Sequence, residues 1–243
     1  MKIQIKSIED FKTVINKARH FRLENGRPFV TVTYAQSLDG SIATVNRQQM
    51  QLSGEESMHL THRLRALNRS ILVGIGTVLA DNPSLTTRLV VGDSPQPIIL
   101  DTNLRTPPNA KLVTRQDLST WIVNGNVATN GRYRRLQQKG ATLISCRCDD
   151  NGWIDLGALM AQLAERKIDS LMVEGGARVI TSFIRWRLAD LFVVTVAPKL
   201  VGGLPVLDTH SYRSKAYLQL DDVHYQKIGK DLILWARPQW GAS

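Results

Sequence analysis

The chain has 243 residues, of which 43% are hydrophobic and 21% charged, a balance typical of a globular protein whose core needs no disulfide or metal ion. Its net charge of +10 would suit nucleic acid or small phosphorylated ligands, but the basic residues are scattered and aromatic residues make up only 6%, so we expect no nucleic-acid partner. No apolar run is long enough to cross a membrane and the first residues lack the apolar core of a signal peptide, so we expect a cytoplasmic protein with no membrane partner.

The N-terminal part of the chain predicts a helix followed by a strand. Ser7 begins a capping pattern ahead of helically spaced apolar residues, which favours a helix over residues 7–21. The run FVTVTYA, residues 29–35, is rich in β-branched side chains and predicts a strand. The stretches SLDG and SIAT that follow, residues 37–44, are typical of a turn and a short extended piece.

A second helix is predicted after Ser53. Ser53 and Glu56 have the spacing of a capping box, in which two side chains satisfy the free N–H groups at the start of a helix. The helix would bury one apolar stripe, formed by Leu60, Leu64 and Leu67. Arg63 and Arg65 lie beside this stripe, so we expect both in solvent; the alternative is an arginine that binds a substrate phosphate through its forked guanidinium.

Strands and helices then alternate to the C-terminus. The run ILVGIG, residues 71–76, predicts a buried strand and a tight glycine turn, and Asp155 is the expected N-cap of a helix. Further strands are predicted at residues 97–100, 120–124, 141–145, 169–176 and 191–198, with helices at 131–140, 156–167 and 177–189. A hairpin over residues 223–237, joined through Gly229 and Asp231, closes the chain.

This alternation predicts the fold class. Strands separated by helices of ten to fifteen residues indicate an α/β fold with a mostly parallel central sheet covered on both faces, and the closing hairpin adds antiparallel strands at one edge. The chain has no internal repeat or long linker, which favours one domain. In such sheets ligands bind at the carboxyl ends of the parallel strands, so the residues that follow each strand are the candidates for a site.

The sequence VEGG, at the end of one predicted strand, is the first candidate. Gly175 and Gly176 would let backbone N–H groups approach a ligand, and the start of a helix favours phosphate. The same glycine pair fits a purely structural turn equally well. Glu174 is more indicative, because an acid beside a buried strand carries a desolvation cost that a partner or ligand must offset.

Residues 71–88 are the second candidate. After the strand and the glycine turn come the hydroxyl of Thr77, the turn Asp81–Pro83 and a threonine pair that ends at Arg88, which together predict a shaped polar loop. A helix-capping loop with Asp81 as the cap is the alternative, and the two interpretations are compatible.

Several classes of site are missing from the sequence. It has no zinc-deaminase signature, P-loop, G-x-S-x-G elbow or H-E-x-x-H motif. Cys146 and Cys148 are separated by a single residue, a spacing that does not suit a zinc knuckle, so we expect neither a disulfide nor a zinc site. His59 and His62 are three residues apart without a third ligand nearby, so we expect a solvated surface pair and no bound metal.

Five blocks of the sequence, taken in order, resemble a known family: FVTVTYAQSLDGSIAT, LTHRLRALNRSILVGIGTVLADNPSLTTR, PIILDTNLRTP, LMVEGGARVITSFI and ADLFVVTVAPKLVGG. From about Pro28 to the C-terminus they resemble the C-terminal reductase domain of the bifunctional riboflavin-biosynthesis deaminase/reductase and its stand-alone relatives. The resemblance implies a dihydrofolate-reductase-like three-layer α/β/α fold, NADPH as cofactor, a phosphorylated aminopyrimidine ribosylamine reduced to its ribityl form, and a homodimer. It also implies one reductase domain over residues 1–243, with residues 1–27 as a helical extension.

The resemblance further implies roles for individual residues. Glu174 is the first candidate for acid–base catalysis and Asp81 the second. Arg105, past a cofactor strand, would bind the 2′-phosphate of NADPH. The other residues expected around the cofactor are Ala35, Thr77, Asp81, Thr102, Gly175, Gly176, Ala177, Arg178, Val179, Ile180 and Thr181. The residues expected to face the substrate are Gln49, Arg65, Leu85, Arg88 and Glu174.

The chain departs from the family pattern at two positions near the expected ligands, which leaves the exact substrate open. Gln51 stands where many relatives have a tryptophan, and Thr33 where bifunctional relatives often carry a lysine. Residues 1–27 are too short to form a deaminase, so reduction either precedes or follows deamination by another protein. Two other functions also stay open: an NADPH reductase of a different small phosphorylated or pteridine-like substrate, and a non-catalytic nucleotide-binding protein that kept the fold.

Overall fold

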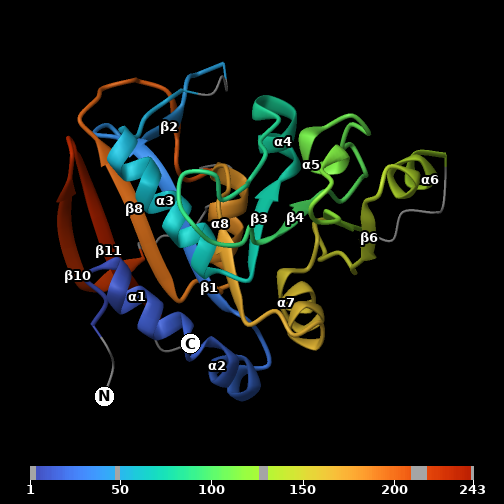
Figure 1. Cartoon of the computed structure of the whole chain (residues 1–243), viewed down its shortest axis with the longest axis horizontal. Coiled ribbons are helices and arrows are strands. Elements are labelled where there is room, and N and C mark those ends of the chain that lie inside the picture. The colour runs from blue at the N-terminus through green and yellow to red at the C-terminus, as the bar shows by residue number, and fades with distance from the viewer. Residues whose placement is uncertain (1–3, 47–49, 126–130, 209–217, 242–243) are drawn as a thin grey trace.

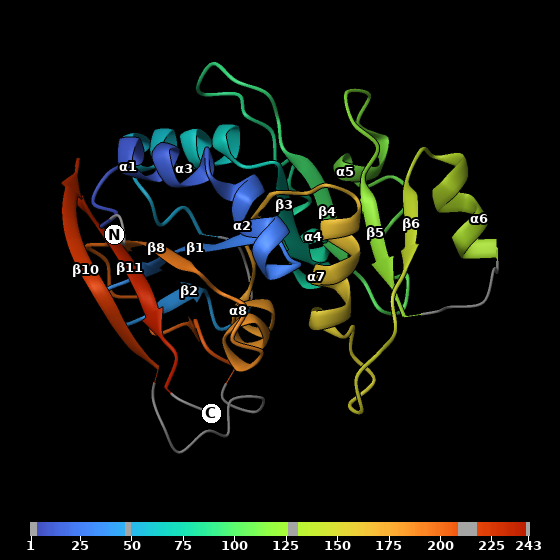
Figure 2. The same cartoon turned by 90° about the horizontal axis from the view of Figure 1, so that it is seen from below.

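The computed structural model describes residues 4–46, 50–125, 131–208 and 218–241. Its centre is a nine-stranded sheet in the order β10-β11-β8-β1-β7-β3-β4-β5-β6 (Figures 1 and 2). All neighbours from β8 to β6 are parallel, and the β10–β11 hairpin joins β8 antiparallel at one edge. The predicted mostly parallel sheet with a C-terminal antiparallel hairpin is therefore confirmed.

The strands of the central sheet are Phe29–Ser37 (β1), Ser70–Gly74 (β3), Gln96–Leu100 (β4), Trp121–Asn124 (β5), Thr142–Ser145 (β6), Ser170–Val173 (β7), Leu191–Ala197 (β8), Gln219–Ile228 (β10) and Asp231–Gln239 (β11), while Ser41–Ala43 (β2) and Leu204–Pro205 (β9) form a small second sheet. The helices are Ile8–Ile15 (α1), Ala18–Asn25 (α2), Glu55–Leu67 (α3), Ile75–Asp81 (α4), Lys111–Thr114 (α5), Gly131–Gln138 (α6), Leu156–Glu165 (α7) and Ala177–Arg185 (α8). Within the described ranges, no helix is long and apolar enough to span a bilayer.

The fold has three layers, because helices cover both faces of the sheet and a hydrophobic core cluster lies on each face. Along β3, Ile71 and Val73 point into one cluster and Leu72 into the other, as the alternation of a strand requires. The first cluster gathers side chains from α1 to α6, and the second gathers side chains from α7 and α8. The strands are therefore buried on both faces, which explains their continuous apolar runs.

The chain differs from the expected elements in a few places. The helix expected over residues 7–21 is two helices, α1 with Ser7 as its cap and α2, which continues to Asn25 and ends at Gly26 with a φ of 65°. The expected cap of α7 is confirmed, because the Asp155 carboxylate accepts the Ala158 N–H. The helix α4 replaces the glycine turn and the first part of the polar loop expected after β3, so that expectation is wrong for residues 75–81. The short elements α5 and β9 were not expected either, because one helical turn and two strand residues leave no periodic signal.

The capping box expected at the start of α3 is wrong. The N-cap is Gly54, and no side chain caps the helix. The Gly54 N–H instead donates to the buried Asp231 carboxylate at 2.8 Å. The turn of the C-terminal hairpin packs so closely here that a Cβ on Gly229 would lie 2.7 Å from Glu56 Oε2. A distant contact has therefore replaced the local cap.

Candidate active site

The carboxyl ends of β3 and β7, which are neighbours in the sheet, bring the two candidate segments together. The Glu174 N–H donates to the Leu72 carbonyl at 3.0 Å. A Cβ on Gly74 would lie 2.7 Å from Val179 Cγ2, so the glycine lets α8 pack against the end of β3. A Cβ on Gly176 would lie 3.7 Å from Thr77 Oγ1, which places the start of α4 beside the start of α8.

A buried ion pair joins α3 to the end of β7. Arg65 Nη2 lies 2.8 Å from Glu174 Oε1 and 2.7 Å from Oε2, and Nε donates to Oε1 at 3.2 Å. The two side chains are only 10% and 18% exposed. The expectation that Arg65 is solvated is therefore wrong, whereas Arg63 is an exposed side chain paired with Glu9. The desolvation cost inferred for Glu174 is offset by this partner.

The loop after α4 folds over α3 and covers its polar face. Arg65 Nη1 donates to the Thr86 carbonyl at 3.2 Å, and the Arg88 N–H donates to His62 Nδ1 at 3.1 Å. His62 is fully buried, so the expectation of a solvated histidine pair is wrong for His62, although His59 is exposed. The periodicity of α3 alone could not show that a loop twenty residues later would cover this face.

The buried His62 makes the stability of the fold depend on pH. Burial, followed by the charges of Arg65 and Arg88, lowers the pKa of His62 to about 4. An unfolded histidine titrates near 6.5, so between about pH 6.5 and 4 the unfolded chain binds a proton that the folded chain does not. We expect His62 to make the free energy of unfolding lower by on the order of 1–2 kcal/mol at pH 5 than at pH 7. Urea unfolding at both pH values should show a smaller loss in His62→Gln; an equal loss in both proteins would contradict the prediction.

Asp81 is the unpaired acid of the site. It is the last residue of α4, followed by Asn82 at a φ of 42°, so the alternative that Asp81 caps a helix is wrong. Thr77 and Asp81 are four residues apart and share a face of the helix, the face that Thr77 turns toward Gly176. Burial raises the pKa of Asp81. Among the described residues its carboxyl group makes no hydrogen bond or ion pair, unlike that of Glu174.

The start of α8 supplies backbone donors more than side chains. No side chain caps this helix, whose N-cap is Gly176. Arg178 is exposed, whereas Val179 packs against Gly74 and Gly175. The remaining side chains expected around the cofactor from this helix are buried: Ala177, Ile180 and Thr181. An anion at α8 could therefore bind to the backbone N–H groups of the first turn and to the Arg178 side chain.

The end of β4 carries Thr102 and Arg105 on a rigid loop. The fully buried Asp101 carboxylate accepts both the N–H and the hydroxyl of Thr106 at 2.7 Å. Its other oxygen lies 3.9 Å from Arg105 Nε, and the Arg105 side chain is 48% exposed. Arg132 of α6 donates to the Leu104 carbonyl at 3.4 Å, so two arginines flank this loop.

Two of the remaining expected positions, Ala35 and Leu85, fall within the described residues. Ala35 of β1 pairs with Thr195 of β8 and lies three residues past the last residue of β1 that pairs with β7. Leu85 is buried and has a φ of 52°. Gln49 lies outside the described residues. Of the two departures from the family pattern, Thr33 is buried and Gln51 is exposed, with its carbonyl accepting from Lys199 Nζ at 2.6 Å.

Asp39, which the sequence marked only as part of a turn, ties two loops together. Its carboxylate accepts the Ser37 hydroxyl at 2.5 Å, the Gly202 N–H at 2.6 Å, the Ser41 hydroxyl at 2.9 Å and the Val201 N–H at 3.0 Å. These hydrogen bonds, the one from Ser37 foremost, lower the pKa of Asp39. The loops after β1 and β8 are thereby fixed beside the carboxyl edge. No local pattern could have revealed partners 162 and 163 residues away.

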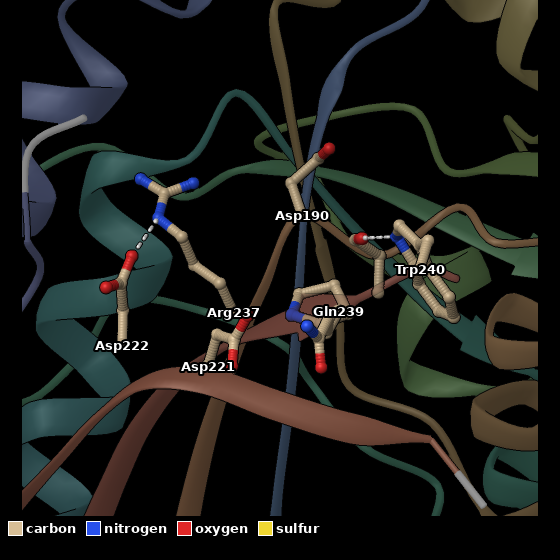
Figure 3. A pocket seen from close by; sticks show the side chains of 8 residues that line it. Asp190, Asp221, Asp222, Arg237, Gln239 and Trp240 are labelled. Carbon is tan, nitrogen blue, oxygen red and sulfur yellow. Dashed lines mark hydrogen bonds and ion pairs between the residues drawn. The ribbon is translucent and has the colours of Figure 1, made fainter. Parts of the chain in front are cut away.

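A pocket of about 590 Å³ lies at the opposite edge of the sheet, next to the start of β8 (Figure 3). Asp190, Asp221 and Asp222 line it together with Arg237, and Trp240 Nε1 donates to the Ala189 carbonyl. Arg237 Nε is 3.8 Å from Asp222, and Asp190 is already held by Arg27. A lining with three acids and one arginine repels phosphate, so this pocket does not suit the expected ligands.

Comparisons with known proteins show which proteins this chain resembles. The model of the RibD C-terminal domain family matches residues 28–234. The chain is 32% identical to the riboflavin biosynthesis protein RibD of Aquifex aeolicus, covering 93% of this chain and 60% of that protein. It is 30% identical to the 2,5-diamino-6-ribosylamino-4(3H)-pyrimidinone 5′-phosphate reductase of Archaeoglobus fulgidus, covering 87% of this chain and 98% of that protein.

Solved structures show the same fold. The riboflavin biosynthesis reductase Rib7 of Saccharomyces cerevisiae matches with a TM-score of 0.74 and 29% identity, covering 95% of this chain and all of that one. RibD of Acinetobacter baumannii matches with a TM-score of 0.76 and 23% identity, covering 93% of this chain and 62% of that one. This chain therefore spans about three fifths of the RibD proteins but nearly the full length of the single reductases.

Proposed function

Since the chain belongs to the RibD C-terminal domain family, we propose that it is an NADPH-dependent reductase of riboflavin biosynthesis. Its substrate would be a phosphorylated aminopyrimidine ribosylamine, either the 2,5-diamino compound or its deaminated form, and its product the ribityl compound. The observation that carries the proposal is the match along 98% of a relative named for this reduction. We further propose that the protein works in the cytoplasm as a homodimer, with residues 1–243 as one domain and residues 1–27 as its helical extension.

The carboxyl edge fits a phosphorylated dinucleotide. The first turn of α8 presents N–H groups that no side chain caps, and Gly175 and Gly176 keep side chains away from them. Thr77 adds a hydroxyl from α4 at the same place. Thr102 and Arg105 follow β4, two strands away from β7, and Ala35 follows the β1–β7 pairing. We propose that the pyrophosphate binds at α8 and the adenosine half near β4.

The substrate side is organised around the ion pair of Arg65 and Glu174. Both oxygens of Glu174 already accept hydrogen bonds from Arg65. The ion pair therefore serves mainly to position the pyrimidine and the ribose of the substrate. Arg88 is exposed on the loop that His62 and Arg65 hold in place, which suits it to bind the substrate phosphate. Leu85 belongs to the same loop, and its buried side chain anchors the loop to the core.

The chemistry needs two reactants held close together and one proton. The ribosylamine opens to an imine, NADPH when bound supplies a hydride to the former anomeric carbon, and the imine nitrogen takes a proton. Asp81 is the residue we assign to hold that proton, because burial raises the pKa of its carboxyl and no partner occupies it among the described residues. Glu174, whose oxygens are engaged by Arg65, positions the substrate instead.

The proposal is tested by supplying freshly made diamino and deaminated ribosylamine phosphates with NADPH. We expect loss of NADPH absorbance together with a product two mass units heavier than one of the two substrates. If the protein reduces neither compound but does reduce a pteridine-like compound, the proposed substrate is wrong. NADPH binding without hydride transfer to any candidate would favour the non-catalytic nucleotide-binding protein.

Arg105 should set the preference for the phosphorylated coenzyme. We expect Arg105→Ala to raise the KM for NADPH about tenfold and leave the KM for NADH unchanged, because the lost guanidinium would contact only the 2′-phosphate. Arg134→Ala, which removes an exposed arginine of α6, is the matched control and should change neither constant. An equal rise in KM for both coenzymes would show that Arg105 supports the loop and does not contact the 2′-phosphate.

A further inference from the structure

The segment between β6 and α7 is a tightly built hairpin, which we call the 146–155 hairpin. Cys148 and Ile154 form an antiparallel bridge, and the Asp149 N–H donates to the Trp153 carbonyl at 2.7 Å. The Asp149 carboxylate accepts the N–H groups of Asn151 and Trp153, both at 3.0 Å. These local hydrogen bonds define the shape of the hairpin.

The hairpin leaves the sheet at the edge where the coenzyme would bind. A Cβ on Gly125, just after β5, would lie 2.6 Å from Cys148 Sγ and 2.9 Å from Thr102 Cγ2. The base of the hairpin therefore lies against the carboxyl ends of β4 and β5. Figure 2 shows the segment between β6 and α7 extending beyond the arrowheads of β5 and β6, on the side of the molecule where α8 lies.

The hairpin presents an exposed tryptophan that reaches α8. The Arg178 guanidinium lies over the Trp153 ring, 5.8 Å from its centroid, and Arg178 belongs to the first turn of α8. Arg178 Nε is also 3.6 Å from Asp208. Trp153 nevertheless stays 52% exposed. The exposed indole of this hairpin offers a flat apolar face on which the ring of a ligand can stack.

We infer that Trp153 and Arg178 bind the adenosine half of the coenzyme, with the adenine stacked on the open face of the indole and a phosphate beside the guanidinium. This inference rests on the proposed function. β4 lies two strand spacings, roughly 10 Å, from β7, so a dinucleotide whose reactive ring is near Glu174 extends its other half toward Thr102 and the hairpin. Stacking on an aromatic ring tolerates any base, and an adjacent arginine adds attraction to the phosphate.

The test compares two exposed tryptophans. Trp153→Ala removes the proposed platform, Trp153→Phe keeps a smaller one, and Trp186→Ala removes a ring that is 43% exposed at the far end of α8. The probes are NADPH and adenosine 2′,5′-bisphosphate, which has the adenine and the phosphates but no nicotinamide. We expect calorimetry to show about tenfold weaker binding of both probes to Trp153→Ala, less than threefold for Trp153→Phe, and no change for Trp186→Ala.

Fluorescence supplies a readout that a structural role would not move. Stacked adenine should quench the tryptophan emission of the wild type when the bisphosphate binds, and Trp153→Phe should lose most of this quenching while it still binds the probe. Unchanged affinity in Trp153→Ala, or quenching that persists in Trp153→Phe, would overturn the inference and leave the proposed function intact. A wild-type protein that binds neither NADPH nor the bisphosphate would overturn both.

Discussion

Arg65→Met is expected to lower the free energy of unfolding by about 3–5 kcal/mol and kcat/KM by at least about a hundredfold. The substitution leaves the Glu174 carboxylate, 18% exposed, without the three hydrogen bonds that Arg65 gives it. It also releases the Thr86 carbonyl, and with it the loop that carries Arg88. Because the reacting atoms must be held to within about an ångström, movement of this loop and of Glu174 should reduce the rate even at saturating NADPH. Urea unfolding and steady-state kinetics measure the two losses.

Arg63→Met is the matched control for this prediction. Arg63 lies two residues away on the same helix and makes an ion pair of 2.8 Å with Glu9, close to the 2.7 Å of the Arg65–Glu174 pair. That pair is exposed, so its loss should cost less than about 1 kcal/mol and leave the kinetics unchanged. Equal effects of the two substitutions would contradict a special role for the buried pair. A stable Arg65→Met protein with wild-type kinetics would remove Arg65 and Glu174 from the site.

The positions of most strands and helices, and with them the mostly parallel sheet, could be predicted because they depend on local patterns. The alternating side chains of β3 and the Asp155 cap of α7 are examples, since each involves residues only a few positions apart. Several of the failures share one cause. At the start of α3 the Gly54 N–H donates to Asp231 of the C-terminal hairpin, and His62 is covered by the loop at Arg88, so both features depend on contacts between distant segments.

In the candidate site, too, some features follow from the local sequence and others depend on contacts between distant segments. Glu174 and its two glycines stand out in the sequence because an acid and a flexible turn end an apolar strand. That Arg65 engages both oxygens of Glu174 depends on how α3 crosses the sheet, which no spacing in the chain encodes locally. The contact matters for function, because it shifts our preferred proton donor from Glu174 to Asp81. A pattern of residue types identifies the acids present, but only their partners show which acid is left to exchange a proton.

Asp81→Asn is accordingly expected to lower kcat by at least about a hundredfold while NADPH binds within about threefold of the wild-type affinity. Asparagine keeps the size of the side chain but has no proton to give at the imine nitrogen. The pH profile supplies the sharper measurement. Burial raises the pKa of Asp81, so a wild-type enzyme that needs the protonated form should lose activity as the pH rises through that pKa. The residual activity of Asp81→Asn should lack this decline.

Two further variants decide between the acids. Asp93→Asn removes an exposed carboxylate on the loop after α4 and should leave both kcat and the pH profile unchanged. Glu174→Gln should destabilise the protein, because the buried Arg65 charge loses its partner, yet its remaining activity should keep the wild-type decline at high pH. If Glu174→Gln abolishes that decline and Asp81→Asn retains it, Glu174 is the proton donor despite its ion pair. The proton must then pass through a carboxylate that Arg65 releases during turnover, and the loop held by the Thr86 carbonyl would have to move with it.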